Sequence, residues 1–284
     1  MSKTKKNIIW IASYPKSGNT WFRVFLSNVL SQNTEPISIN DIINTPIASS
    51  RELFDYYSGV SSSDLTLDEI NRLRPRVYQQ LSDSSTKSIF IKVHDAWGFN
   101  KDELPIFPPE ITKGVIYIVR NPFDICISAS YHNSISIEQS VKNINNSNYK
   151  LGHNEFKLNK QITHVIQNWS EHIVSWLDTS NLPVHVLKYE DLLDDPLKHF
   201  SQSLEFLQID CEKNKIEIAI KNSSFKILQD MEYENGFKER PIYAKMFFRA
   251  GKTNIGRDML EQRQITQLTD NHKKMMQRFN YLCD

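Results

Sequence analysis

Four short apolar runs alternate along the chain with longer segments in which apolar residues recur at helical spacing. The four runs are Asn7–Ala12, Ser88–Val93, Gly114–Val119 and Pro183–Leu187. Each is flanked by turn residues, as is typical of short strands. Because strands that alternate with helices form a parallel sheet covered by helices on both faces, the pattern predicts an α/β fold with a central, mostly parallel sheet.

The first predicted helix follows the first strand directly. Its apolar face carries Trp21, Phe22, Phe25, Leu26, Val29 and Leu30. This spacing is that of an amphipathic helix, and Asn19 or Thr20 is expected to cap it. Further helices are expected over Leu67–Leu81, Pro122–Tyr131, Ile162–Leu177 and Pro196–Phe206, and from Met259 towards the C-terminus.

No repeat of fixed period and no linker rich in proline, glycine or serine divides the chain. Residues 1–284 are therefore expected to form a single domain. Residues 133–160 are rich in Asn, Ser and Lys and hold few apolar residues. We expect this segment to be a surface excursion, either a lid over a site or an insertion without function.

Composition and charge narrow the class of protein. With 39% hydrophobic and 24% charged residues the chain is an ordinary globular protein, and its net charge of +1 disfavours nucleic acid or an anionic membrane as partner. Cys126, Cys211 and Cys283 lack the spacing of metal ligands, so we expect reduced thiols and no bound metal. Apolar runs fall short of a signal peptide and of the roughly 18 residues of a membrane span. These features predict a cytoplasmic protein.

Residues 14–21, with the sequence YPKSGNTW, join the first strand to the first helix. Such a junction gathers backbone N–H groups, a helix N-terminus and Lys16 around one point, an arrangement that binds phosphate. Gly18 lets the backbone approach an anion, although an ordinary strand-to-helix turn is the alternative. The lysine precedes the glycine and the first glycine of the ATPase pattern is absent, which disfavours hydrolysis of a nucleoside triphosphate.

Two later segments add candidate phosphate ligands. Arg120 follows the third strand, where open α/β sheets bind ligands, and Ser128 lies two helical turns further on. A helix cap formed by Arg120 and Asp124 is the alternative. The segment 248–252, FRAGK, together with Arg257 is also basic, and a solvated surface patch is its alternative interpretation.

These segments resemble, in order along the chain, the cofactor-binding segments of the sulfotransferase family. The match includes P-K-S-G-x-T-W at 15–21 and R-N-P-x-D-x-x-x-S at 120–128, and it runs from residue 8 to about residue 257. The resemblance implies a P-loop-type α/β fold. It also implies transfer of a sulfuryl group from 3′-phosphoadenosine 5′-phosphosulfate (PAPS), which leaves adenosine 3′,5′-bisphosphate (PAP).

The resemblance also implies which residues bind the cofactor. In the first loop they are Lys16, Ser17, Gly18, Asn19, Thr20 and Trp21. Arg120 and Ser128 match ligands of the 3′-phosphate. The C-terminal loop supplies Arg249, Ala250 and Gly251, with Ala250 in place of the family's lysine and without the tryptophan that follows it in the family.

The adenine ring needs aromatic side chains to stack on. Trp21, Tyr189 and Phe225 are the candidates, although core packing is the ordinary role of any one aromatic residue. Tyr189 opens a Y-E-D string, and Ser223 and Phe225 belong to an S-S-F string that resembles the family's T-S-F segment. We therefore include Ser223 among the expected cofactor-binding residues.

The second strand ends in I-K-V-H-D, which places Lys92 and His94 on the same face of the strand. An imidazole, with a pKa near 6.5, suits a general base, and the K-x-H string resembles the family's catalytic segment. We predict in-line transfer, with His94 taking the acceptor's proton, Lys16 neutralising the leaving oxygen and Lys92 stabilising the sulfuryl oxygens. No metal is needed in this scheme. The resemblance implies that Ser128 hydrogen-bonds Lys16 before the acceptor arrives.

The acceptor is expected to be a small molecule with a hydroxyl or an amine. Charged residues follow the base and precede the C-terminal loop: Asp95, Glu232, Glu234, Lys238 and Glu239. If the carboxylates line the site, the acceptor is polar and cationic; otherwise they are surface charges on a lid. A P-loop kinase that needs ATP and Mg²⁺, or a nucleotide-binding module without activity, is the alternative function. Monomer and homodimer remain open.

Overall fold

A computed structural model describes residues 5–42, 45–154 and 157–282, so that Cys283 lies outside the described residues. The chain forms two compact units. The first comprises Met1–Tyr14, Asn44–Tyr117 and Asn146–Val186, and the second comprises Pro15–Ile43, Ile118–Asn145 and Leu187–Asp284. Both units are therefore built from segments that are distant in the sequence.

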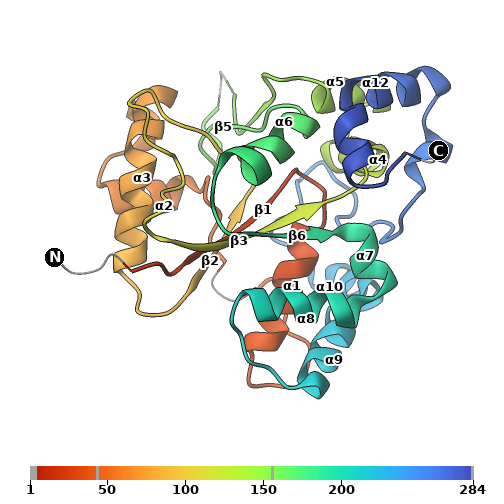
Figure 1. The fold of residues 1–284 in the computed structure, drawn as a ribbon, viewed down its shortest axis with the longest axis horizontal. Helices are drawn as coiled ribbons and strands as arrows, with labels where there is room; N and C mark the ends of the chain where they lie inside the picture. Colours follow the sequence, from red (N-terminus) through yellow and green to blue (C-terminus); the bar gives the residue numbers. More distant parts are fainter. Residues whose placement is uncertain (1–4, 43–44, 155–156, 283–284) are drawn as a thin grey trace. The chain divides into compact units, whose positions relative to one another are not determined.

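A central sheet carries the strands predicted from the apolar runs (Figure 1). It contains β1 (Ile8–Ser13), β2 (Ile89–Val93), β3 (Thr112–Val119) and β6 (Val184–Lys188), in the order β2-β1-β3-β6. Strands β1 and β2 are parallel, with Ile8 opposite Ile89 and Ala12 opposite Val93. All six residues of β1 are buried, which explains its unbroken apolar character. The prediction of a central parallel sheet is confirmed.

The first unit contains the helices α2 and α3, the short 3₁₀ helix η1 and an antiparallel pair of short strands. It also contains α6, which continues into the π-helical turn η2. Their bounds are α2 (Arg51–Ser58), η1 (Ser62–Asp64), α3 (Leu67–Asp83), β4 (Lys150–Leu151), β5 (His164–Val165), α6 (Trp169–Val174) and η2 (Ser175–Thr179). Helices α2 and α3 lie side by side (Figure 1). The helix expected over Ile162–Leu177 begins later, because β5 occupies its start and the Asn168 side chain caps α6 by accepting from the Glu171 N–H.

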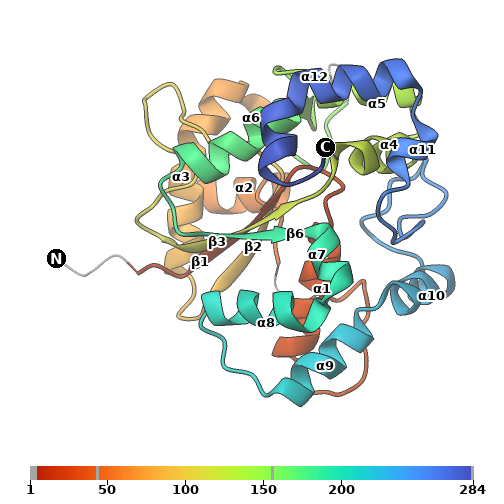
Figure 2. The ribbon, with the colours of Figure 1, turned by 45° about the vertical axis from the view of Figure 1, so that its right-hand side comes forward.

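Helices dominate the second unit. They are α1 (Asn19–Leu30), α4 (Pro122–Asn133), α5 (Ile137–Ile144), α7 (Tyr189–Asp194), α8 (Pro196–Phe206), α9 (Lys213–Asn222), α10 (Phe225–Asn235), α11 (Gly256–Met259) and α12 (Gln262–Arg278). Helix α9 packs against α1 and α8, while α12 packs against α4 and α5 (Figure 2). The prediction for Pro196–Phe206 is confirmed at both ends.

One expectation about the second unit is wrong. Neither Asn19 nor Thr20 caps α1, because Gly18 occupies the N-cap position with no side-chain hydrogen bond and Asn19 is already helical. The surface excursion expected over 133–160 stays a prediction, and within it α5 packs on α4. Val141 and Ile144 are buried on one side of α5, whereas Leu158, outside this helix, is exposed.

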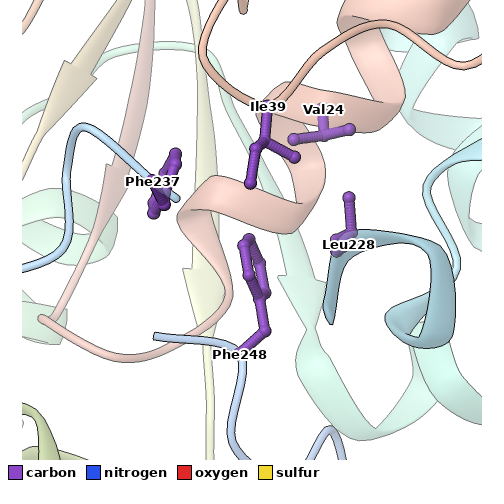
Figure 3. Close-up of a cluster of buried hydrophobic side chains, with 5 residues drawn as sticks. All are labelled: Val24, Ile39, Leu228, Phe237 and Phe248. Atoms are coloured by element: carbon purple, nitrogen blue, oxygen red, sulfur yellow. The ribbon is translucent and has the colours of Figure 1, made fainter. Parts of the chain in front are cut away.

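The apolar core of the second unit supports the segment that leads to the C-terminal loop. Val24 of α1 and Leu228 of α10 pack with Ile39, Phe237 and Phe248 (Figure 3). Because Phe237 and Phe248 lie near the two ends of an irregular segment, their burial fixes that segment against α1 and α10. Residues 249–251 follow directly.

Candidate cofactor-binding and catalytic site

The loop between β1 and α1 turns through two residues with left-handed backbone. Lys16 has a φ of 72° and Gly18 a φ of 104°. A Cβ atom at Gly18 would lie 2.6 Å from the Tyr189 ring, so that only glycine fits there. Ser17 is buried, and its Oγ has no hydrogen-bond partner among the described residues. The loop thus places a buried hydroxyl without a partner next to the backbone N–H groups at the N-terminus of α1, an arrangement that suits an anion.

The Lys16 amino group is held by α4 and by the C-terminal segment. Its Nζ lies 3.2 Å from His132 Nδ1 and 4.1 Å from the centre of the Phe247 ring. His132 contacts Phe247 as well, edge to face at 5.3 Å. Sequence reasoning missed His132, although it lies one helical turn after the half-buried Ser128 on the same side of α4.

Arg120 connects the loop between β1 and α1 with the C-terminal loop of the second unit. Its Nη1 donates to the Lys16 carbonyl at 3.1 Å and its Nη2 to the Lys252 carbonyl at 3.0 Å. The guanidinium lies 4.1 Å from the centre of the Tyr189 ring, and its Nε is buried without a partner among the described residues. The guanidinium therefore organises both loops and keeps one buried donor available for a ligand.

Asp124 does not cap α4 with Arg120. The cap is Asn121, whose side chain accepts from the Phe123 N–H at 3.0 Å. The Asp124 carboxylate instead accepts from the N–H groups of Asn254 at 2.9 Å and Gly256 at 2.7 Å. It anchors the chain just after the C-terminal loop, where the tryptophan of the family is missing.

The C-terminal loop is built around a second close approach of glycine and an aromatic ring. Gly251 has a φ of 57°, and a Cβ atom there would lie 2.3 Å from the Phe225 ring. The Arg249 guanidinium stacks 4.2 Å from the centre of the Tyr131 ring, with Ala250 half-buried beside it. This loop combines a cation with a tightly packed backbone.

The remaining aromatic candidates are packed in the same unit. Trp21 contacts Tyr189 edge to face at 5.6 Å, and its buried Nε1 has no partner in the described part of the chain. Phe225 contacts Phe248 at 6.5 Å. Ser223 is fully buried at the end of α9, where its hydroxyl donates to the Ala219 carbonyl at 2.8 Å.

His94 lies in the first unit, directly after β2. Its Nδ1 is 2.9 Å from the Ser13 carbonyl, which only accepts, so that Nδ1 carries the hydrogen and Nε2 the lone pair. In the described residues Nε2 has no hydrogen-bond partner. Burial and the neighbouring Lys92 hold the pKa of His94 well below its ordinary value, against the opposing effect of the Ser13 contact. The imidazole is therefore neutral near pH 7 and able to accept a proton.

Three of the four carboxylates expected to attract an acceptor are engaged elsewhere. Asp95 forms a buried ion pair with Arg74 at 2.5 Å. Burial raises the pKa of Asp95, but the charges of Arg74 and His164 together with hydrogen bonds hold it below its usual range. Glu232 accepts the N–H groups of Phe247 and Phe248 at 2.7 and 2.8 Å. A bidentate ion pair at 2.8 and 3.1 Å joins Glu239 to Arg23. The expected cationic acceptor loses this support, because these groups stabilise the fold; Glu234 and Lys238 are exposed.

The second unit brings Lys16, Arg120, Tyr189 and the C-terminal loop together, and the first unit holds Lys92 and His94 at the end of β2. Within the described residues no cluster of three or more His, Cys, Asp and Glu side chains has an arrangement suited to a metal ion. None of the described helices is long and apolar enough to cross a membrane.

Relatives and solved structures point to one family. Cytosolic sulfotransferase 17 of Arabidopsis thaliana is 22% identical over 285 residues, which cover 94% of this chain and 73% of the relative. Flavonol 3-sulfotransferase of Flaveria bidentis is 25% identical over 264 residues, with coverages of 88% and 75%. The structure of mouse sulfotransferase SULT7A1 complexed with PAP superimposes with a TM-score of 0.60 at 17% identity, covering 96% of this chain and 85% of that one.

The structural similarity confirms the predicted P-loop-type α/β fold. The family model described as the sulfotransferase domain matches residues 6–280, nearly the whole chain, so the protein belongs to the sulfotransferase domain family.

Proposed function

We propose that this protein transfers the sulfuryl group of PAPS to a hydroxyl or an amine of a small-molecule acceptor. The observation that carries the proposal is the set of buried polar atoms without partners in the first loop and beside it, in a sulfotransferase domain: Ser17 Oγ, Trp21 Nε1 and Arg120 Nε. The mouse relative named above is bound to PAP, the product of PAPS. The match over residues 6–280 supports a single functional domain, and the cytosolic relatives support a cytoplasmic location.

The chain's own residues fit such a nucleotide. The amides of residues 17–20 at the start of α1 and the Lys16 amino group suit the 5′-phosphate, and Arg120, Ser128 and Arg249 suit the 3′-phosphate. Tyr189, Trp21 and Phe225 supply aromatic surface for adenine. When bound, PAPS supplies the sulfuryl group. Lys16 places positive charge where the leaving oxygen gains negative charge, a role that needs no metal.

His94 is the proposed general base. Because Nδ1 donates to the Ser13 carbonyl, Nε2 is the atom that receives the acceptor's proton. Lys92, whose charge adds to burial in lowering the pKa of His94, is proposed to stabilise the sulfuryl oxygens. Lys92 and His94 both lie at the end of β2, so the strand fixes the spacing between them.

The base assignment is tested with His94→Ala in a PAPS-dependent assay over a panel of hydroxyl and amine acceptors. We expect kcat to fall by about 10²- to 10⁴-fold while the affinity for PAP stays within about twofold. His153→Ala, which removes an exposed imidazole of the same unit, serves as control and keeps full activity. Turnover by His94→Ala at the wild-type rate removes His94 from the mechanism.

The shift in Tm on adding a nucleotide tests whether the protein binds PAP rather than ATP with Mg²⁺, as a kinase would. PAP is expected to raise Tm, whereas ATP with Mg²⁺ at the same concentration is expected to raise it less. Sulfuryl transfer to any acceptor of the panel excludes a binding module without activity. A larger shift with ATP and Mg²⁺, without sulfuryl transfer, contradicts the proposal.

A further inference from the structure

We propose that His172 is a positioning residue that fixes the backbone carrying the His94 base; this inference rests on the function proposed above. The segment His94–Trp97 follows β2 and has no regular secondary structure. An irregular backbone at a site holds its place only when its polar groups are bound by surrounding groups. Most of the groups that bind this segment come from one helical stretch, residues 172–176.

Three side chains of that stretch bind backbone groups of the segment, while the Val165 carbonyl accepts from the Ala96 N–H at 2.8 Å. His172 Nε2 lies 3.1 Å from the His94 carbonyl, and Trp176 Nε1 donates to the Asp95 carbonyl at 2.8 Å. Ser175 Oγ accepts from the Trp97 N–H at 3.0 Å. The spacing of these residues puts them on one face of α6 and of the π-helical turn that follows it. The helix therefore determines where the segment, and with it Cα of His94, lies.

His172 is held in a single tautomer by two partners. The Tyr117 hydroxyl donates to Nδ1 at 2.7 Å, and the carbonyl of His94 requires the hydrogen on Nε2. Both ring nitrogens are thus occupied. His172 is fully buried, and burial lowers its pKa to about 4, so it stays neutral near pH 7. Because both of its ring nitrogens are engaged in hydrogen bonds, it has no lone pair to offer a substrate and does not serve as the base. A fixed neutral imidazole is suited to orienting its neighbour.

The consequence for catalysis follows from the two anchors of His94. Its side chain is bound through Nδ1 to the Ser13 carbonyl, and its main chain is bound through the carbonyl to His172. Loss of the second anchor leaves the tautomer of His94 intact but lets the ring move. A displacement of about 1 Å at a reacting group lowers the rate by about 100-fold without weakening the binding of distant parts of the substrate. The expected signature is a fall in kcat at an unchanged KM for PAPS.

The experiment compares His172→Phe and His172→Gln with His272→Phe. His272 is another fully buried histidine, on α12 of the second unit, and serves as matched control for the loss of a buried imidazole. We expect His172→Phe to lower kcat about 10- to 100-fold with KM for PAPS within about threefold. His172→Gln, whose amide keeps a donor for the His94 carbonyl, is expected to recover most of that loss. His272→Phe loses stability but keeps kcat.

Equal kcat for His172→Phe and His272→Phe, or no recovery in a folded His172→Gln, overturns the proposal. If His172→Phe does not fold, Tyr117→Phe removes only the hydroxyl that fixes Nδ1. Tyr117→Phe is then expected to lower kcat by about threefold or more. A kcat equal to that of the wild type would overturn the proposal. The His94→Ala variant separates the two hypotheses. If His94→Ala is fully active, His94 is not the base. If His94→Ala is inactive but the His172 variants are fully active, only the positioning role of His172 is refuted.

Discussion

At the scale of single residues, two glycines of the second unit approach aromatic rings so closely that a side chain would displace the ring. Gly18 meets Tyr189 and Gly251 meets Phe225, and both rings are candidates to contact the adenine. Each glycine also has a positive φ. These two close contacts between a glycine and an aromatic ring explain why both loops contain a glycine, although the chain has only eight glycines.

Substitution of Gly251 by alanine is expected to weaken nucleotide binding more than it weakens the fold. A Cβ atom 2.3 Å from the Phe225 ring forces the ring to move, in addition to a backbone strain of about 1–2 kcal/mol. We expect the Kd for PAP, measured by calorimetry, to rise about tenfold. Gly59→Ala is the matched control, because Gly59 has a φ of 69° and open space where its Cβ would lie. A similar Kd for the two variants would show that Phe225 does not contribute to binding.

Residue types and spacing were enough to point to Lys16, Gly18 and Arg120, because each lies in a short motif at a strand end. His132 was missed because its contact with Lys16 joins positions 116 residues apart. Glu232 was misjudged for a related reason. A charged residue near a loop is usually solvated, and only the fold shows that backbone N–H groups surround it.

At the scale of elements, the irregular segment between α10 and the C-terminal loop owes its order to buried groups at both ends. Phe237 and Phe248 enter the apolar cluster of Figure 3, and the buried Glu232 carboxylate binds two successive N–H groups, those of Phe247 and Phe248. Phe247 in turn contacts Lys16. Glu232 therefore connects the stability of this segment to Lys16 of the loop between β1 and α1.

Replacement of Glu232 by glutamine is expected to destabilise the protein and to weaken PAP binding together. One side-chain oxygen becomes an NH₂ group that faces a backbone donor, so at least one charge-assisted hydrogen bond is lost, at a cost of about 1.5–3 kcal/mol. Urea unfolding and calorimetry with PAP measure the two effects. Glu234→Gln, two residues further on and exposed, should change neither. Unaltered stability of Glu232→Gln contradicts the anchoring role.

The elements that sequence reasoning placed best are those with strong local signals. Helix α8 begins at Pro196 after the capping residue Asp195, and its two ends agree with the prediction. The stretch 162–177 was misassigned because β5 is only two residues long and pairs with β4, a partner that local periodicity does not show. The π-helical turn that places Ser175 and Trp176 likewise has no sequence signal.

At the scale of the whole molecule, the parallel sheet was predictable because three of its strands, β1, β2 and β3, are largely buried and read as apolar runs, whereas β6 is partly exposed. The division into two units was not. Strands β3 and β6 each pass from the first unit to the second, after Tyr117 and after Val186, so no linker marks the change in the sequence. The proposed base, His94, lies in the first unit, whereas the proposed phosphate loop begins the second unit at Pro15, directly after the first unit's segment that ends at Tyr14.

Buried histidines in both units make the stability of the molecule depend on pH. Burial lowers the pKa of His172 and of His272 to about 4, whereas a histidine in the unfolded chain titrates near 6.5. Between these values the unfolded state binds protons that the folded state excludes, so the free energy of unfolding falls as pH decreases and is fully retained above the unfolded value. Each histidine contributes up to about 1.4 kcal/mol per pH unit.

Urea unfolding at several pH values from 7.5 to 5 measures this slope, and His94 and His164, whose pKa values burial also lowers, add to it in the same direction. His272→Gln removes one titrating imidazole, so the free energy of unfolding should depend less steeply on pH. His153→Gln, at an exposed position, should leave this pH dependence unchanged. His272 is the right site for this test, because it lies outside the proposed catalytic and cofactor-binding residues and its loss leaves the base untouched. An unchanged slope in His272→Gln would mean that the imidazole is protonated in the folded protein despite its burial.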